Sequence, residues 1–285
     1  MEYREFGKTG FKVSAIGMGT YYDPSYITLA RLFRLHQNRV FKIAALRKGI
    51  ELGINIIDTA EIYETETLVS EAIKFFKRDE IFIATKVWPT HLSYNGVLKA
   101  AERSLKRLGC SYIDLYQIHF PNPLIPLEET MRAMSRLVDE GKIRHIGVSN
   151  FSLEQLKKAQ EALPKHELVS NQVEYSLVSR SIEKDLLPFC EENNIIILAY
   201  RPLSHGKLSK ATGKLKTVVE EIGCKYGGKT PAQIALNWLI SKSKTVLPIP
   251  RASKPERVVE NTGAVGWSLA KEDMDRLEAV ASFYK

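Results

Sequence analysis

Residues 113–149 read IDLYQIHFPNPLIPLEETMRAMSRLVDEGKIRHIGVS and contain a strand, a helix and a second strand, in that order. The runs Ile113–His119 and Arg144–Ser149 are short and largely apolar, which predicts buried strands. Between them, Leu127–Glu140 has apolar residues at helix spacing, namely Leu127, Met131, Met134, Leu137 and Val138. This alternation is typical of a parallel sheet covered by helices.

The same alternation extends over most of the chain. Further strands are expected at Val13–Gly19, Asn55–Asp58, Ile81–Val87, Leu168–Tyr175, Ile195–Tyr200 and Thr245–Ile249. Two helices have clear starts, because Ser152 is a capping residue before one and Thr230 with Pro231 begins another. Eight such units without a break in composition predict an α/β fold, a single (β/α)8 TIM barrel domain over residues 1–285.

Two segments lie outside the eight units. Met1–Lys12, with a turn from Gly7 to Gly10, predicts an N-terminal β-hairpin, and Leu269–Ala281 predicts a C-terminal helix. A doubly wound sheet is the alternative fold. That fold usually carries a GxGxxG turn, and residues 17–20 (GMGT) supply only half of it.

The composition is that of an ordinary globular protein, with 44% apolar and 26% charged residues, and it excludes a disordered or fibrous chain. The apolar run Ile195–Tyr200 is far shorter than the ~20 residues that span a bilayer. Residues 1–10 lack the apolar core of a secretory signal. We therefore expect a cytoplasmic protein without a membrane partner.

The cysteine and histidine patterns argue against a metal site. Cys110, Cys190 and Cys224 lie far apart with no CxxC spacing, which indicates buried free thiols. The six histidines form no HxH or HExxH arrangement. The net charge of +8, from 41 basic and 33 acidic residues, is compatible with nucleic acid, an acidic membrane surface or a phosphorylated small molecule.

One motif match is misleading. Residues 223–230 (GCKYGGKT) fit the P-loop pattern GxxxxGK[ST], but a P-loop follows a strand. Here Leu215–Tyr226 has a helical pattern, Gly227 and Gly228 end it, and Thr230 starts the next helix. We expect a helix–turn–helix connection at this place and no nucleotide-triphosphate hydrolysis.

Polar residues gather where the predicted strands end, which is where a barrel places its active site. These ends carry Asp58 and Thr59, Lys86, His119, Ser149 and Asn150, Gln172, Tyr200, and Arg251. Taken singly, each has an ordinary structural explanation, such as a helix cap for Asp58 or a core position for His119. Their occurrence at seven strand ends predicts a common site.

The motifs at these ends resemble those of the aldo-keto reductase family and follow the family order over nearly the whole chain. They are Asp58–Tyr63 (DTAEIY), Ala84–Trp88 (ATKVW), Asp114–His119 (DLYQIH), Ile146–Phe151 (IGVSNF), Asn171–Tyr175 (NQVEY), Pro248–Arg251 (PIPR) and Pro255–Asn261 (PERVVEN). The ordered set is specific, although each motif alone is weak. The resemblance implies NADPH-dependent reduction of an aldehyde or ketone to an alcohol.

The resemblance implies a catalytic set of Asp58, Tyr63, Lys86 and His119. These residue types suit carbonyl reduction, because hydride addition makes an alkoxide that needs a proton donor. A tyrosine with a pKa of ~10 is a poor donor at neutral pH, so Lys86 is expected to lower the pKa of Tyr63. Asp58 would hold the lysine in place, and His119 would donate a hydrogen bond to the carbonyl oxygen.

The resemblance also implies a nicotinamide site, in which Ser149, Asn150 and Gln172 bind the amide and Tyr200 stacks on the ring. Arg251, where the family commonly has lysine, and Arg257 suit a ribose 2′-phosphate, which favours NADPH over NADH. Asn261 would face the adenine. The implied cofactor contacts are Thr20, Ser149, Asn150, Gln172, Tyr200, Leu203, Arg251, Ser253, Arg257 and Asn261. Ala252 stands where the family has serine.

Three features depart from the family pattern. Glu64 stands where glycine is usual, Arg201 stands where a small residue is usual, and the first connection carries an atypical basic insertion at about residues 22–40. Trp88 and Phe120 are candidate walls of the substrate pocket, with ordinary barrel packing as the alternative.

Two other functions stay open on the sequence. A barrel that binds the cofactor and acts as a regulatory or interaction subunit would keep this site with little catalysis. A nucleic-acid-binding protein would use the basic surface. Since Arg251 and Arg257 account for part of the basic charge, the charge indicates a phosphorylated cofactor rather than nucleic acid. We also expect a small-molecule carbonyl partner and a monomer or weak oligomer.

Overall fold

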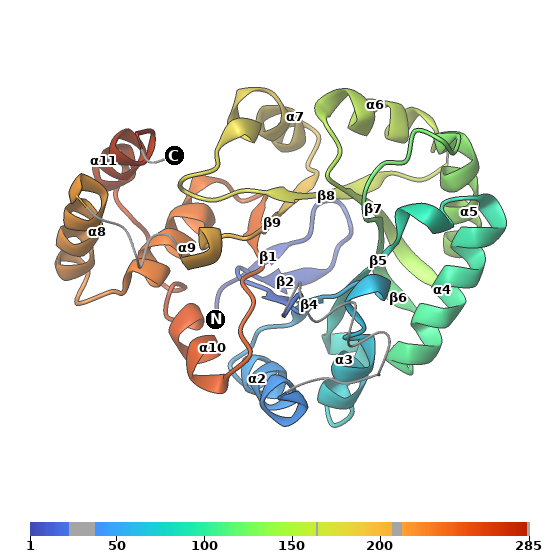
Figure 1. Ribbon diagram of the computed structural model, residues 1–285, viewed down its shortest axis with the longest axis horizontal. Helices are drawn as coiled ribbons and strands as arrows, with labels where there is room; N and C mark the ends of the chain where they lie inside the picture. Colours follow the sequence, from blue (N-terminus) through green and yellow to red (C-terminus); the bar gives the residue numbers. More distant parts are fainter. Residues whose placement is uncertain (23–37, 164, 207–212, 284–285) are drawn as a thin grey trace.

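A ring of parallel strands forms the centre of the computed structural model, which describes residues 1–22, 38–163, 165–206 and 213–283 (Figure 1). Eight strands make one sheet in chain order. They are β3 (Met18–Gly19), β4 (Ile56–Asp58), β5 (Phe82–Val87), β6 (Ile113–Ile118), β7 (Ile143–Ser149), β8 (Leu168–Glu174), β9 (Ile196–Tyr200) and β10 (Val246–Pro248).

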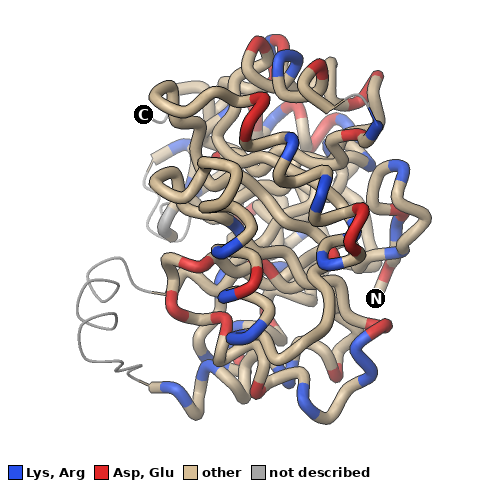
Figure 2. Tube along the Cα trace, turned by 90° about the vertical axis from the view of Figure 1, so that its right-hand side faces the viewer, with Lys and Arg blue, Asp and Glu red and all other residues tan. Residues whose placement is uncertain are grey.

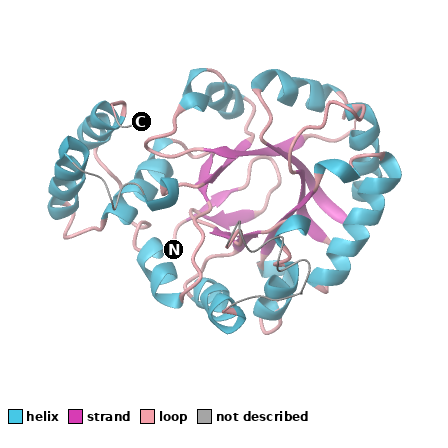
Figure 3. Ribbon diagram, in the orientation of Figure 1, coloured by secondary structure: helices cyan, strands magenta, loops and turns pink. Residues whose placement is uncertain are grey.

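Helices surround this ring (Figure 3). They are α2 (Arg39–Glu51), α3 (Glu66–Ile73), α4 (Tyr94–Leu108), α5 (Leu127–Asp139), α6 (Leu153–Glu161), α7 (Leu186–Glu192), α8 (Gly213–Lys225), α9 (Pro231–Lys242), α10 (Pro255–Thr262) and α11 (Lys271–Ala281). The prediction of a C-terminal helix is confirmed by α11. Most of the predicted insertion at 22–40 lies outside the described residues.

The two edges of the sheet meet and close the barrel. The amide of Gly17 donates to the carbonyl of Pro248 at 2.9 Å, and the amide of Gly19 donates to the carbonyl of Pro250 at 3.1 Å. A Cβ at position 19 would lie 2.8 Å from the carbonyl oxygen of Ile249, so the seam needs glycine there. The predicted (β/α)8 TIM barrel is confirmed.

The prediction of a single strand over Val13–Gly19 is wrong. Its first part belongs to the N-terminal hairpin, in which β1 (Tyr3–Glu5) pairs antiparallel with β2 (Lys12–Ser14). Only Met18–Gly19 joins the barrel. Between the two pieces, the Ser14 hydroxyl donates to the carbonyl of Ile16 at 2.7 Å, a local side-chain bond that competes with continued strand pairing. The hairpin itself is confirmed.

The hairpin fills the amino-terminal end of the barrel. Phe6 is fully buried, and its ring centroid lies 4.6 Å from that of Phe82, the first residue of β5. Phe11 contacts the same ring at 5.3 Å. A larger core lies between the strands and the helices. The hairpin therefore closes one end of the barrel, which leaves the carboxyl ends of the strands for a site.

The P-loop match forms a connection between two helices, as expected. Helix α8 ends before Gly227 and Gly228, whose φ angles of 77° and 79° stop it. Thr230 and Gln233 then form a capping box at the start of α9. Among the helices that the structure describes, none is long and apolar enough to cross a membrane. The described residues also contain no group of His, Cys, Asp and Glu that could hold a metal ion.

Candidate active site

A cavity of about 840 Å³ lies at the carboxyl ends of the strands. This size is typical of small-molecule sites. Eleven of the residues predicted from the sequence line it, namely Asp58, Tyr63, Trp88, His119, Phe120, Ser149, Asn150, Gln172, Tyr200, Leu203 and Arg251. These residues come from the carboxyl ends of seven of the eight barrel strands, β4 to β10. Lys86, near the end of β5, is fully buried and is not among the described lining residues.

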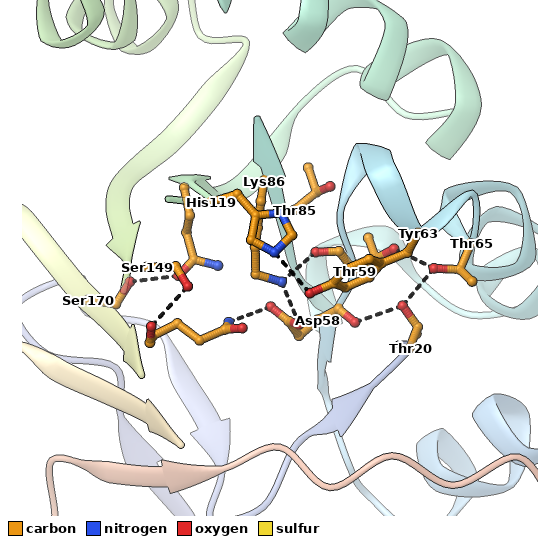
Figure 4. Close-up of polar contacts among 12 residues, drawn as sticks. Thr20, Asp58, Thr59, Tyr63, Thr65, Thr85, Lys86, His119, Ser149 and Ser170 are labelled. Atoms are coloured by element: carbon orange, nitrogen blue, oxygen red, sulfur yellow. Dashed lines mark hydrogen bonds and ion pairs between the residues drawn. The ribbon is translucent and has the colours of Figure 1, made fainter. Parts of the chain in front are cut away.

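Lys86 and Asp58 form a buried ion pair beneath the cavity (Figure 4). The Lys86 ammonium donates to Asp58 Oδ2 at 2.7 Å and to the carbonyl of Thr59 at 2.8 Å. Gln172 Nε2 donates to the other carboxylate oxygen, Oδ1, at 2.7 Å. Both oxygens of Asp58 are thus bonded, which fixes the position of the lysine and leaves one of its three N–H groups for a further partner.

Tyr63 and His119 face each other above this pair. Tyr63 belongs to the short 3-10 helix Glu61–Tyr63 that follows β4, and its Oη lies 3.2 Å from His119 Nε2. Burial, with a smaller effect of the Lys86 ammonium, lowers the pKa of His119 to about 2, so the ring is neutral. His119 Nδ1 is buried without a partner. Since a buried N–H without an acceptor is costly, we assign the proton to Nε2.

The expectation that Lys86 lowers the pKa of Tyr63 is wrong for this arrangement. Burial is the largest effect and raises the pKa of Tyr63 well above 10, and the nearby Asp58 carboxylate raises it further. The Lys86 ammonium lies 4.9 Å from the centre of the Tyr63 ring, but its hydrogen bonds go to Asp58 and Thr59. Burial likewise lowers the pKa of Lys86, against the effect of Asp58. Tyr63 is therefore firmly protonated at neutral pH.

The residues predicted to bind a nicotinamide amide form one hydrogen-bond network. The Ser149 hydroxyl donates to the carbonyl of Gln172 at 2.9 Å. Asn150 Nδ2 donates to the carbonyl of His119 at 3.0 Å, and Asn150 Oδ1 accepts from the Tyr200 hydroxyl at 2.8 Å. Asn150 adopts a left-handed conformation with φ 63°, which turns its side chain back toward the strand ends. The network fixes Tyr200 beside the cavity.

Of the residues predicted to bind the 2′-phosphate and the adenine, only Arg251 is among the described residues that line the cavity. Arg251 lines the cavity, whereas Arg257 and Ser253 are exposed, and Arg257 pairs with Glu260 at 2.6 Å. Asn261 is buried on α10. Among the described lining residues, the cavity reaches Arg251 but not these three.

Thr20 is also absent from the cavity lining. It lies fully buried beside Asp58, where its hydroxyl donates to the carbonyl of Asp58 at 3.0 Å and contacts the Thr65 hydroxyl at 2.8 Å (Figure 4). Its position predicts support of the strand end that carries Asp58.

Aromatic side chains form one wall of the cavity. His119 stacks on Phe120 with ring centroids 5.0 Å apart, and Trp88 meets His119 edge-on at 5.2 Å. The buried carboxylate of Glu61 accepts hydrogen bonds from the Trp88 amide and from His91 Nδ1, the latter at 2.9 Å. Glu61 thus ties the turn that carries Tyr63 to the loop that carries Trp88.

The sequence reasoning missed several lining residues, of which Tyr21, Ile62 and Pro202 are examples. Tyr21 packs on Tyr63 with ring centroids 4.9 Å apart. It lies two residues after the end of β3, so the rule that site residues follow strand ends was sufficient to find it.

Glu64 and Arg201, two residues that differ from those usual in the resembled family, have a left-handed backbone conformation, with φ angles of 56° and 50°. This conformation disfavours side chains and explains the usual glycine at the first position. Arg201 lines the cavity and pairs with Glu174 at 3.2 Å.

Comparisons with known proteins agree with the fold. The model of the Aldo/keto reductase family matches residues 29–282. The methylglyoxal reductase YeaE of Escherichia coli is 36% identical, over 93% of this chain and 89% of its own length. The glyoxal reductase of Bacillus subtilis is 37% identical, over 83% of this chain and 82% of its own length. A crystal structure of an aldo-keto reductase from Klebsiella pneumoniae in complex with NADPH is 35% identical, with a TM-score of 0.85 over 99% of this chain and 96% of that chain.

Proposed function

Because the chain belongs to the aldo/keto reductase family, we propose that it reduces a small aldehyde or ketone to an alcohol, with NADPH as the preferred cofactor and Tyr63 as the general acid. The observation that carries this proposal is the convergence of Tyr63, His119 and the Lys86–Asp58 pair at one cavity. When bound there, a reduced nicotinamide would supply the hydride that adds to the carbonyl carbon.

Tyr63 would donate the proton that the resulting alkoxide needs. Its raised pKa keeps the hydroxyl hydrogen in place until the strongly basic alkoxide forms. The phenolate left behind would lie close to the Lys86 ammonium. Two of the three N–H groups of this ammonium bond Asp58 and Thr59, and the third is not used by those bonds. Lys86 then acts by stabilising the product of proton transfer rather than by ionising Tyr63 beforehand.

His119 would orient the carbonyl group. Its Nε2–H already points to Tyr63 Oη at 3.2 Å, so a carbonyl oxygen seated between the two side chains could accept from both. Because the imidazole is neutral, it polarises the carbonyl by a hydrogen bond and supplies no proton of its own.

The polar residues beside the catalytic set fit a nicotinamide. Gln172 Oε1 and the second lone pair of Asn150 Oδ1 are acceptors for a carboxamide NH2, since Gln172 Nε2 and Asn150 Nδ2 bond within the protein. The Tyr200 ring borders the same part of the cavity and suits stacking. Ser149, Asn150, Gln172 and Tyr200 would therefore hold the ring with one face toward His119 and Tyr63.

Arginine at the far end of the cavity supports the preference for NADPH. Arg251 offers a planar fork of N–H donors that matches phosphate oxygens. Arg257, Ser253 and Asn261 lie on or just before α10, beyond the cavity lining, and would complete the phosphate and adenine contacts. Arg257 would have to exchange its surface pair with Glu260, which costs little.

The aromatic wall of Trp88 and Phe120 suits a small carbonyl compound. The names of two relatives, a methylglyoxal reductase and a glyoxal reductase, point to short dicarbonyl compounds as the first substrates to examine.

The test follows loss of reduced-cofactor absorbance with NADPH and a panel of aldehydes that includes methylglyoxal and glyoxal. Wild type should oxidise NADPH, and Tyr63→Phe should lower kcat about 10²- to 10⁴-fold, the usual contribution of a general acid. Tyr3→Phe, the same change in the distant hairpin, should leave kcat unchanged. Equal rates for wild type and Tyr63→Phe would exclude the acid role. Tight NADPH binding without turnover in wild type would instead support a regulatory cofactor-binding barrel.

A further inference from the structure

Arg251 lies at the seam that closes the barrel. It lies three residues after the end of β10 and forms an isolated parallel bridge with Gly19, the last residue of β3. Strand β3 has only two residues, so few ladder hydrogen bonds hold the chain that follows it. The position of the next residues therefore depends on side-chain contacts.

The Arg251 guanidinium makes such contacts. Its Nη1 donates to the carbonyl of Tyr21 at 3.3 Å and to the carbonyl of Tyr22. The Tyr21 ring in turn rests on Tyr63, with centroids 4.9 Å apart and planes tilted by 51°. Arg251, Tyr21 and Tyr63 all line the same cavity. A short physical path thus runs from the phosphate end of the cavity to the proposed acid.

The chemistry of arginine allows two simultaneous roles here. A guanidinium has five N–H donors, and the two carbonyl contacts both use Nη1, which carries two of them. The three donors on Nη2 and Nε stay available and have the fork geometry that phosphate oxygens accept. A lysine ammonium has three donors without a fixed fork, so it cannot serve both sets of acceptors equally well.

We propose that Arg251 is a positioning residue for Tyr63. It holds the Tyr21 backbone, and this contact keeps the Tyr21 ring packed on Tyr63. This inference rests on the proposed function and adds a second role to the phosphate contact assigned there. A 2′-phosphate bound to Nη2 and Nε would further fix the guanidinium, and hence Tyr21. The carbonyl substrate should therefore be used more efficiently with NADPH than with NADH, at saturation with each cofactor.

The covering of Tyr63 has a consequence for pH dependence. Burial is the largest cause of its raised pKa, and Tyr21 adds to it. If Tyr21 moves away, water reaches Tyr63 and its pKa falls toward 10. The basic limb of the kcat profile should then move to lower pH.

The main experiment uses NADH, which has no 2′-phosphate, so that any effect of Arg251 cannot come from binding that group. With saturating NADH, Arg251→Ala should lower kcat/KM for the aldehyde about fivefold or more and shift the basic limb downward. Tyr21→Ala should lower kcat/KM and shift the basic limb in the same way. In the Tyr21→Ala background, Arg251→Ala should cause no further change in either quantity, because the two residues act through one contact. Lys254→Ala, an exposed cation three residues away, is the matched control and should have no effect.

A second readout needs no turnover. In protein without added cofactor, amide hydrogen exchange of the peptide that contains Tyr21 and Tyr22 should be faster in Arg251→Ala than in wild type, with Arg251→Lys between them and equal exchange elsewhere in the barrel. Unchanged exchange in this peptide, or an unchanged pH profile and kcat/KM with NADH, would overturn the proposal. If the proposed function were wrong, wild type would oxidise neither NADPH nor NADH. The hydrogen-exchange data would still decide whether Arg251 holds the Tyr21 backbone.

Discussion

At the scale of single residues, the site depends on a pair that is costly to bury. Lys86 is fully buried, and its ammonium is stabilised there by Asp58 and by the carbonyl of Thr59. Removing one partner of a buried pair typically costs ~3–5 kcal/mol because the other charge is left without compensation. Because burying both charges is itself costly, the pair is weak evidence for a net gain in stability.

The ionisation of His119 gives a prediction on pH. Its pKa of about 2 in the folded protein, against ~6.5 for an unperturbed histidine, means that the ring stays neutral between pH 5 and pH 8. We expect kcat/KM to show no acid limb from His119 between pH 8 and pH 5. The measurement is kcat/KM against pH with a non-ionising aldehyde. An acid limb near pH 6.5 that disappears in His119→Asn would contradict the assignment.

The same depressed pKa has a consequence for stability. The folded state keeps His119 neutral, while the unfolded chain binds a proton below pH ~6.5. The unfolded state thus binds more protons, and the free energy of unfolding falls as pH drops from ~6.5 toward 2. The stability that His119 contributes is fully present only above that window.

At the scale of elements, Glu278 of α11 makes several contacts with the rest of the barrel. Glu278 accepts from Trp238 Nε1 at 3.1 Å and from the Lys242 ammonium at 2.8 Å, and it also pairs with Arg180. These partners come from α9 and from the loop after β8. A single side chain therefore connects the C-terminal helix to two other parts of the chain.

We predict that Glu278→Ala lowers the free energy of unfolding by ~1–3 kcal/mol, because Trp238 Nε1 loses its acceptor and two cations lose a partner. The loss should be limited, since Glu183 still accepts from Arg180 and lies 3.3 Å from Lys242. Urea denaturation measures the change. Asp275→Ala, on the exposed face of the same helix, should change stability by less than ~0.5 kcal/mol. Equal effects of the two substitutions would show that helix propensity, not the network, is responsible.

At the scale of the whole molecule, the two ends of the barrel have separate tasks. The hairpin closes the amino-terminal end with Phe6 and Phe11 against Phe82, while the cavity lies at the other end. Strand β5 connects both, since it begins at Phe82 and carries Lys86 near its end. Acidic and basic residues alternate along the trace in Figure 2, so the basic excess forms no uniform face in that view.

This division predicts that Phe6→Ala destabilises the fold without impairing the chemistry. The fully buried ring leaves a cavity when truncated, and such substitutions typically cost ~3–5 kcal/mol. We expect a lower free energy of unfolding in urea but an unchanged kcat at 25 °C for the folded fraction. A loss of kcat as large as that in Tyr63→Phe would show that the two ends are coupled.

Much of the architecture was predictable from local patterns. A strand covered on both faces must be apolar along its length, and a covering helix must be apolar on one stripe, so the segment 113–149 indicates both elements. The first strand was predicted wrongly because Val13 and Met18 are both buried, one in the hairpin and one in the barrel. Burial alone does not distinguish these two environments.

The sequence by itself determined the alternation of strands and helices and the residue types at the strand ends, because both are properties of short segments. Only the tertiary structure decided which of those residues meet. Gln172 reaches Asp58 across 114 residues, and Arg251 reaches the backbone of Tyr21 across 230. The tertiary structure also decided the direction in which the pKa of Tyr63 shifts, since desolvation depends on everything that surrounds the hydroxyl and not on one neighbouring charge. Closure of the barrel is the physical reason, because it brings the first and last strands together and removes water from the groups between them.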